Sequence, residues 1–221
     1  MTSTLETVKR NIQTAAEAAG RPARDITLVA VSKTKPIDVI TPVLEAGHRI
    51  FGENKVQEAA RKWPALRETY PDIELHLIGP LQSNKARQAM RIFDIIETVD
   101  RPRLARAIAR ISAEEGCRPR CYIQINIGRE PQKAGVHPEA ADAFIALCRD
   151  ELKLDLQGLM CIPPAGEDPT PHFAELKAIA RRNRISHLSM GMSGDYEQAI
   201  RSGATSVRVG TAIFGPRPPV A

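Results

Sequence analysis

Hydrophobic and polar positions follow two periods along the chain. Short apolar runs rich in β-branched residues predict buried strands, and longer stretches with apolar residues three or four apart predict amphipathic helices. The strands are expected over residues 26–33, 48–54, 74–80, 94–100, 120–128, 155–162, 187–192 and 206–214. Between them, helices are expected over 36–45, 55–70, 83–91, 102–115, 138–149, 172–182 and 195–202.

This strict alternation predicts an α/β fold. Strands separated by helices form a parallel sheet, and eight such units close into a (β/α)8 TIM barrel. An extra N-terminal helix is expected over 3–20, within a lead-in of residues 1–25, and it is predicted to fill the place of the helix missing after the last strand. No linker or repeat divides the sequence, so residues 1–221 are predicted to form a single domain that ends in a proline-rich tail, 216–221.

A lysine ends the first predicted strand, ITLVAVSKTKP. Side chains alternate along a strand, so Val29 and Val31 are expected to point into the barrel and Lys33 to reach its mouth. An amine at the rim of an apolar pocket loses hydration, its pKa falls, and it becomes a nucleophile toward aldehydes. For this lysine alone, an ordinary solvated side chain is the simpler interpretation.

The ends of the last two strands predict an anion site. The segments SMGMSGDYEQAI (189–200) and VRVGTAIFG (207–215) follow the strands where barrels of this class hold phosphate. Ser193 is predicted to cap a helix and to form the site with the N–H groups of Gly194 and Asp195, and Gly210 and Thr211 add further N–H groups. Alternatively, Ser193 caps a helix only and the glycines make turns. Both segments together favour a phosphate-bearing ligand.

Arg208 lies between two valines within the last predicted strand. An unpaired charge there is costly, so an inward side chain needs a partner. A ring nitrogen of a bound heterocycle would serve. An ion pair with a barrel carboxylate such as Glu97, or an outward side chain, are the alternatives.

Composition narrows the function classes. The chain has 221 residues and a net charge of +5, with basic groups such as RKW (61–63) expected on solvated helix faces and few aromatic residues, so no nucleic-acid partner is expected. No apolar run approaches about 18 residues and no secretory signal is evident, so no membrane association and a cytoplasmic location are expected. Cys117 and Cys121 lack a second ligand pair, so no metal site is expected and the thiols are predicted to be reduced.

Five motifs together carry a resemblance that covers residues 26 to 215: VAVSKTKP, FGENKVQEA, HLIGPLQSNK, SMGMSGDYEQAI and VRVGTAIFG. In this order they closely resemble the pyridoxal 5′-phosphate (PLP) homeostasis proteins, which have the fold type III barrel of the alanine racemase N-terminal domain. The resemblance implies that Lys33 forms the internal aldimine with PLP and that Arg208 faces the pyridine nitrogen. It also implies phosphate-binding positions at Ser193, Gly194, Gly210 and Thr211, a cofactor-rim position at Asn54, and a lysine for cofactor exchange at Lys133.

The resemblance implies a carrier rather than an enzyme. The chain ends where racemases and decarboxylases of this fold continue into a β domain with a second acid/base group, and an arginine at the pyridine nitrogen makes PLP a weaker electron sink. We therefore expect a monomer that binds PLP in intracellular homeostasis and hands it to apo forms of PLP-dependent enzymes. The alternatives are a PLP-dependent amino-acid racemase or lyase, and a cofactor-free isomerase of a phosphorylated sugar. Cys161 departs from the family pattern and is expected to place an oxidisable thiol near the site.

Overall fold

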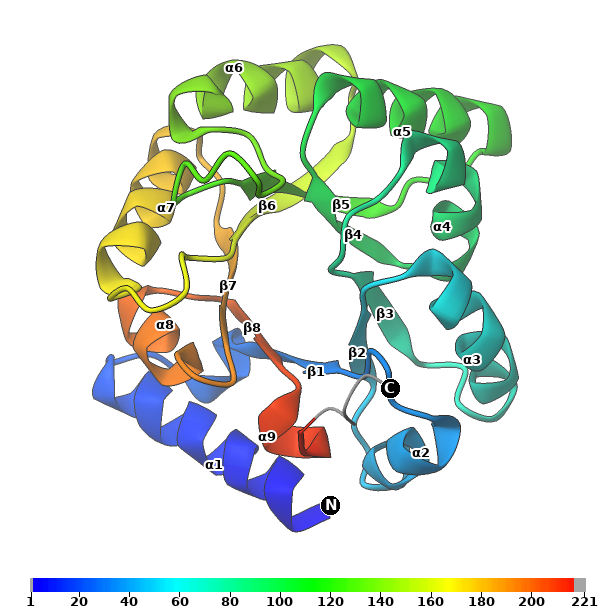
Figure 1. Cartoon of the computed structure of the whole chain (residues 1–221), viewed down its shortest axis with the longest axis vertical. Coiled ribbons are helices and arrows are strands. Elements are labelled where there is room, and N and C mark those ends of the chain that lie inside the picture. The colour runs from blue at the N-terminus through cyan, green and yellow to red at the C-terminus, as the bar shows by residue number, and fades with distance from the viewer. Residues whose placement is uncertain (1, 217–221) are drawn as a thin grey trace.

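The computed structural model describes residues 2–216, which form a closed parallel barrel (Figure 1). Each strand pairs in parallel with its neighbours in chain order, and the last pairs with the first. The strands are β1 (Thr27–Val31), β2 (Ile50–Glu53), β3 (Glu74–Leu77), β4 (Ile95–Val99), β5 (Arg120–Ile125), β6 (Asp155–Cys161), β7 (His187–Met192) and β8 (Ser206–Val209). The predicted (β/α)8 barrel is confirmed.

The helices form a ring around the strands (Figure 1). They are α1 (Thr2–Ala18), α2 (Ile37–Glu45), α3 (Val56–Thr69), α4 (Ala86–Ile92), α5 (Pro102–Glu115), α6 (Ala141–Ala146), α7 (Thr170–Arg182), α8 (Tyr196–Ser202) and α9 (Thr211–Phe214). Short 3-10 turns lie at Ala23–Asp25, Ser83–Lys85 and Pro138–Ala140, and a single π turn at Leu147–Glu151 extends α6.

The last predicted strand, 206–214, is wrong in its second half. β8 ends at Val209, and the carbonyl of Gly210 accepts the N–H groups of Ile213 and Phe214, which begins the short helix α9. A helix therefore does follow the last strand. The four residues TAIF are too few for their spacing to distinguish strand from helix.

The N-terminal helix α1 fills the outer ring beside α8 and α9, as predicted (Figure 1). Leu5, Val8 and Ile12 are buried on its inner face. Its polar side chains add long-range bonds, since Thr4 Oγ1 donates to the carbonyl of Ile213 and Asn11 Nδ2 donates to the hydroxyl of Tyr196. Helix α1 thus covers the seam where the first and last strands meet.

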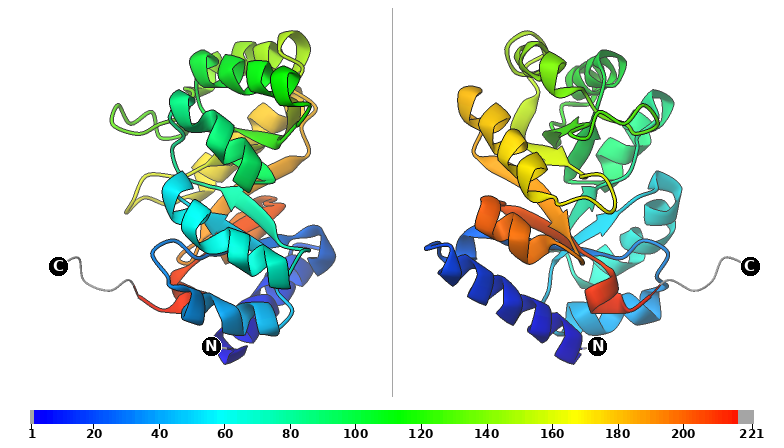
Figure 2. Two further views of the ribbon diagram at one scale, coloured as in Figure 1. Left: turned by 90° about the vertical axis from the view of Figure 1, so that its right-hand side faces the viewer. Right: turned by 60° about the vertical axis from the view of Figure 1, so that its left-hand side comes forward.

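Apolar and polar positions separate across the barrel wall. Leu28 and Ala30 of β1 belong to the large core between strands and helices, whereas Val29 pairs with Arg208 and so shares the inner face of the wall with it. The interior holds a small apolar group of Ile95, Tyr122 and Met160, together with several buried polar side chains. The loops after β5 and β6 project from the same end of the barrel as α9 (Figure 2).

Candidate functional site

A cavity of about 250 Å³ opens at the end of the barrel where the strands have their carboxyl ends. In barrels of this class, that end carries the functional site. Residues from the β1, β2, β3, β6, β7 and β8 units line the cavity: Val31, Lys33, Lys35, Asn54, Ile78, Ile162, Met192, Ser193, Gly194, Arg208, Gly210, Thr211 and Gly215. All the residues predicted for cofactor binding therefore lie around one space.

Lys33 follows β1 by two residues and lines the cavity. Val31 also lines it, and Val29 lies on the same inner face, as the strand alternation predicted. The neighbouring Lys35 donates from its ammonium to the carbonyls of residues 214–216 at the end of α9. One short segment after β1 thus supplies an amine to the cavity and holds the element that follows β8.

Ser193 does not cap a helix, so that part of the prediction is wrong. Helix α8 begins at Tyr196, and Asp195 occupies the cap position, where its carboxylate accepts the N–H of Met192. The N–H of Asp195 donates to the carbonyl of Met192 and is not open to a ligand. The Asp195 side chain therefore closes the turn that the sequence assigned to the serine.

The hydroxyl oxygen of Ser193 instead accepts from the loop after β8. The N–H of Gly210 lies 3.2 Å from it and that of Ala212 lies 3.5 Å away. Gly210 approaches β1 closely, because a Cβ there would lie 3.2 Å from the carbonyl oxygen of Val31. The oxygen of Ser193 therefore occupies both N–H groups, and its hydroxyl hydrogen can be donated to an oxyanion beside Gly194 and Thr211, which also line the cavity.

Asn54 lines the cavity from the end of β2, and its backbone lies directly against Gly79 after β3. A Cβ at Gly79 would lie 2.2 Å from the carbonyl oxygen of Asn54. Any side chain there would displace Asn54, so the glycine of HLIGP has a steric role that its motif alone did not reveal.

Arg208 points into the barrel and is 4% exposed. It donates to the hydroxyl of Ser189 at 2.6 Å and to the carbonyl of Cys161 at 2.8 Å, and it lies 3.9 Å from a carboxylate oxygen of Glu97. The outward alternative is therefore wrong, and the ion pair with Glu97 is present. Because Arg208 also lines the cavity, contact with a bound heterocycle remains a prediction beside this ion pair.

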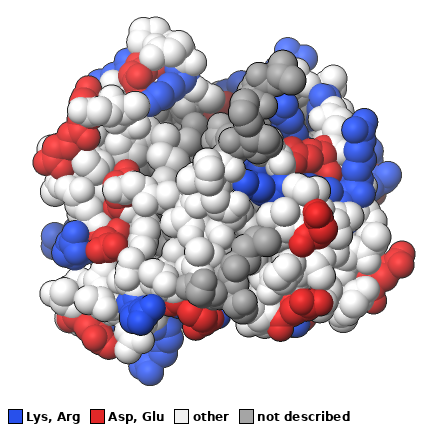
Figure 3. Space-filling view, turned by 60° about the horizontal axis from the view of Figure 1, so that its bottom comes forward, with Lys and Arg blue, Asp and Glu red and all other residues white. Residues whose placement is uncertain are grey.

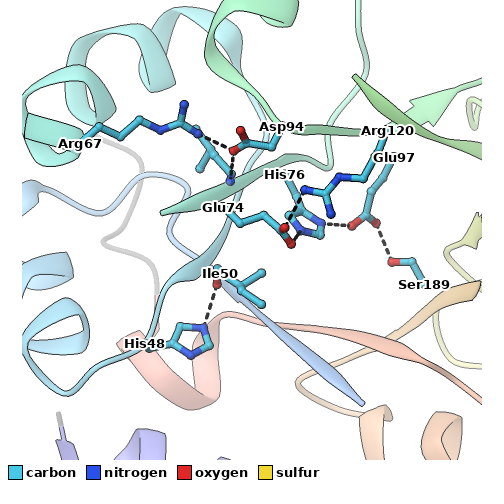
Figure 4. Close-up of polar contacts among 10 residues, drawn as sticks. His48, Ile50, Arg67, Glu74, His76, Asp94, Glu97, Arg120 and Ser189 are labelled. Carbon is cyan, nitrogen blue, oxygen red and sulfur yellow. Dashed lines mark hydrogen bonds and ion pairs between the residues drawn. The ribbon is translucent and has the colours of Figure 1, made fainter. Parts of the chain in front are cut away.

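Arg208 begins a chain of polar contacts that is buried from Arg208 to His76 and partly exposed at its far end, and we call it the axial cluster: Arg208, Ser189, Glu97, His76, Glu74 and Arg120. Glu97 accepts from Ser189 at 2.5 Å and lies 2.6 Å from His76 Nδ1 (Figure 4). On its other side, His76 contacts Glu74, which also accepts from Arg120. The chain runs from the cavity to the opposite end of the barrel, where Glu74 and Arg120 begin their strands.

Charges alternate along the axial cluster. Burial opposes a positive His76, but its hydrogen bonds to Glu74 and Glu97 outweigh burial and raise its pKa to about 9. Burial also opposes a charged Glu97, yet His76 and Arg208 hold the pKa of Glu97 below its usual value. The hydrogen bond from His76 is the largest cause that lowers the pKa of Glu74 to about 2. At neutral pH the cluster therefore alternates between positive and negative groups.

Sequence reasoning missed His76 and Glu74 and named Glu97 only as an alternative partner. The available signal was a charged or imidazole side chain within an apolar strand, in ELHLIG and IIETV. Sequence reasoning also placed the RKW segment on a solvated helix face, whereas the side chain of Lys62 is only 10% exposed in α3. That prediction is wrong for Lys62, because its ammonium reaches back to a carboxylate of β2.

Lys133 does not line the cavity. Its ammonium pairs with Glu130 in the same loop and donates to the carbonyl of Pro163 at 3.3 Å. Pro163 directly follows Ile162, which does line the cavity, so the lysine is near the site without facing it. A role in cofactor exchange therefore stays a prediction.

The thiol of Cys161 faces away from the cavity, which corrects the expectation of an oxidisable group there. The side chain is fully buried in the core between strands and helices, and burial raises its pKa to about 12. The four cysteines are unpaired, and residues 2–216 contain no group of three side chains placed to hold a metal. No helix in that range is long and apolar enough to cross a membrane.

Positive and negative side chains are interspersed on the face shown in Figure 3, so it carries no field of one sign. The fold and the cavity together define a (β/α)8 barrel whose mouth combines an amine, a guanidinium group and backbone N–H donors, a chemistry suited to a small phosphate-bearing ligand. The comparisons with known proteins agree with this class.

The model of the alanine racemase N-terminal domain matches residues 3–218. The pyridoxal phosphate homeostasis protein of Escherichia coli is 40% identical over 222 residues, which cover 96% of this chain and 95% of that protein. Its counterpart from Aquifex aeolicus is 37% identical, with 96% of each chain covered. The chain belongs to the alanine racemase N-terminal domain family and, within it, to the pyridoxal phosphate homeostasis proteins.

Solved structures show the same fold. PipY of Synechococcus elongatus, in a structure with PLP bound, is 37% identical with a TM-score of 0.81, covering 93% of this chain and all of that one. An alanine racemase of Clostridium difficile is 16% identical with a TM-score of 0.74, and the match covers 99% of this chain and 58% of the racemase. The racemase likeness concerns the fold alone.

Proposed function

We propose that this chain binds pyridoxal 5′-phosphate on Lys33 as an internal aldimine and acts in intracellular cofactor homeostasis. The observation that carries the proposal is the single cavity shared by Lys33, Arg208 and the Ser193–Gly210 contact. Membership of the homeostasis protein family and the PLP-bound PipY structure support it.

Each end of the cavity suits a different part of the cofactor. Ser193, Gly194, Gly210 and Thr211 would hold the phosphate through a hydroxyl and backbone N–H groups. Arg208 would donate to the pyridine nitrogen, and Asn54 would contact the rim of the ring. When bound, PLP supplies an aldehyde that a lysine amine can capture and an aromatic ring that can accept electrons.

The residues around the cavity favour holding the cofactor over turnover. A racemase that moves the α-proton between the two faces of the cofactor needs a second acid/base group besides the lysine that binds PLP. Among the described residues that line the cavity, none is a histidine, tyrosine, cysteine or carboxylic acid. Lys35 is the second amine, and its ammonium is engaged by the carbonyls of residues 214–216. The guanidinium of Arg208 also disfavours a protonated pyridine nitrogen, which weakens the electron sink.

An absorbance measurement tests the proposal. Protein saturated with PLP should show the visible band of a lysine Schiff base, and borohydride should remove the band and leave a modified Lys33 in the mass spectrum. Lys33→Ala should lack both signals and still fold. No visible band in saturated wild-type protein would refute the proposal, and exchange of the α-proton of an amino acid in deuterated water would favour a racemase instead.

Transfer to other proteins completes the proposed role. We place the chain in the cytoplasm as a monomer that delivers PLP to apo forms of PLP-dependent enzymes, with Lys133 assisting release. Lys133→Ala should slow reactivation of an apo-aminotransferase by loaded protein, whereas the exposed Lys153→Ala should not. Equal transfer rates in the two variants would remove Lys133 from the proposal.

A further inference from the structure

A cluster of ionic side chains is buried beneath the turn that carries Lys33. Glu53 at the end of β2 is fully buried, and Lys62 and Glu58 of α3 have side chains that are 10% and 25% exposed. The ammonium of Lys62 lies 2.6 Å from a carboxylate oxygen of Glu53 and 2.8 Å from one of Glu58. We call these three residues the turn clamp, and residues 32–35 the Lys33 turn.

The turn clamp uses its polar groups to hold backbone. Lys62 donates to the carbonyl of Ser32 at 3.1 Å and to that of Lys35 at 3.2 Å, so it holds both ends of the turn. Glu58 accepts the backbone N–H of Thr34 at 2.6 Å. A third contact comes from the hydroxyl of Ser32, which donates to Glu53 at 2.8 Å. Ser32, Thr34 and Lys35, the residues on either side of Lys33, are thus all bound to the clamp.

The turn contains a strained residue. Thr34 has φ of +62°, in the left-handed region that a β-branched residue seldom adopts. Such a conformation persists only where surrounding contacts determine it, and strained residues of this kind gather at functional sites. The bonds from Thr34 to Glu58 and from its neighbours to Lys62 are those contacts.

Fold stability alone is a weak reason for this arrangement. The free energy that a buried ion pair loses on dehydration is often as large as the free energy that its attraction contributes. Well-packed apolar residues in its place often give equal or higher stability. Among the described residues, the second carboxylate oxygen of Glu53 has no hydrogen-bond partner, and burial raises the pKa of Glu53 despite Lys62 nearby. What the cluster does provide is a fixed path for the backbone on either side of Lys33.

We propose that Lys62, together with Glu53 and Glu58, positions Lys33: it holds the strained turn so that the Lys33 amine is directed into the cavity. None of the three carboxylate or ammonium groups of the turn clamp lines the cavity, so they act through the turn and not on a ligand. The inference rests on the proposed role of Lys33 as the residue that captures the aldehyde.

Two measurements on the full chain test it. The first is the exchange rate of the Thr34 amide, measured by NMR without cofactor. The second is the rate at which salicylaldehyde and borohydride label Lys33, located by mass spectrometry, since this aldehyde lacks the phosphate and the ring nitrogen. In Lys62→Met we expect faster Thr34 exchange and labelling of Lys33 slowed by about tenfold or more, because a misplaced nucleophile reacts slowly.

Matched variants separate positioning from general weakening. Glu58→Gln keeps an oxygen for the Thr34 amide and should leave both rates close to wild type, whereas Glu58→Leu should change both. Arg110→Met breaks an i,i+4 ion pair with Glu114 on the exposed face of α5 and should change neither. If Lys62→Met does not fold, the comparison of Glu58→Gln with Glu58→Leu tests the positioning role by itself.

The outcomes also separate this inference from the proposed function. Unchanged Thr34 exchange in both Lys62→Met and Glu58→Leu, or faster exchange with unchanged labelling of Lys33, overturns the positioning role. A wild-type chain that shows no visible band with PLP refutes the proposed function, and the salicylaldehyde rates then still decide whether the clamp directs Lys33.

Discussion

The axial cluster and the turn clamp are both ionic and largely buried, yet they bind different partners. The axial cluster joins side chains of β3, β4, β5, β7 and β8 to one another along the barrel. The turn clamp joins side chains of β2 and α3 to the backbone of a loop. The first therefore supports the barrel wall, and the second supports the conformation of four residues at its rim.

The comparison teaches that burial of charge does not by itself indicate what the charge is for. In the axial cluster, both oxygens of Glu97 are bonded and the charges alternate. In the turn clamp, one oxygen of Glu53 has no partner among the described residues, and a strained Thr34 lies next to the lysine. We expect changes in the axial cluster to lower global stability and changes in the clamp to alter the site.

Removal of Glu97 should have the largest effect. Glu97→Ala leaves His76 and Arg208 without their shared carboxylate inside the barrel, and loss of one partner of a buried pair costs about 3–5 kcal/mol. Urea unfolding gives this value. The exposed ion pair of Arg182 with Asp142 is the control, since Arg182→Ala should cost less than about 1 kcal/mol. Equal losses of unfolding free energy in the two variants would contradict the role of the axial cluster in global stability.

The axial cluster should also make stability depend on alkaline pH. The pKa of His76 is raised to about 9 in the folded chain, above its unfolded value of 6.5, so the folded state binds more protons between these values. The stabilising contribution is complete below about pH 6.5 and is lost as the pH rises through about 9, by at most about 3 kcal/mol. Urea unfolding at several pH values should show this fall, and His76→Gln should remove it.

Arg208 links the axial cluster to the cavity, so its replacement should affect the site more than the fold. Arg208→Gln keeps a polar side chain but removes the guanidinium group that contacts Ser189 and faces the proposed ring nitrogen. A hydrogen bond to a charged group is worth about 1.5–3 kcal/mol, so PLP should dissociate about tenfold faster or more. Stopped-flow transfer to an excess of apoenzyme measures this rate. An unchanged dissociation rate would show that Arg208 supports the barrel wall and does not contact PLP.

The smallest effect is expected at Thr34. Thr34→Gly removes the strain of a positive φ but adds freedom to the unfolded chain, so the free energy of unfolding should change by less than about 1 kcal/mol. The same change at the half-buried Thr41, within α2, has no strain to relieve and should cost about 1 kcal/mol or more. Equal losses at the two positions would show that Thr34 is unstrained.

The barrel could be predicted because its pattern is local. Each strand and each helix has its own period, and strict alternation leaves few ways to connect eight such units. The short helix α9 was not predicted because the spacing in TAIF is compatible with either a strand or a helix. Ser193 was misassigned as a cap because α8 begins at Tyr196, which puts Asp195 at the cap position, and both residue types are common there.

The sequence by itself determined which residues reach the mouth of the barrel, since residues that follow parallel strands meet at one end. Lys33, Ser193 and Gly210 were found in this way, whereas Asn54 was named only through the family resemblance. The ionic clusters and the strain at Thr34 were decided only by the tertiary structure. Glu97 and Ser189 are 92 positions apart, and Lys62 resembled a solvated lysine until α3 packed beneath the turn. Burial and pairing of charges depend on which elements pack together, and the local periodicity of the sequence does not show which elements these are.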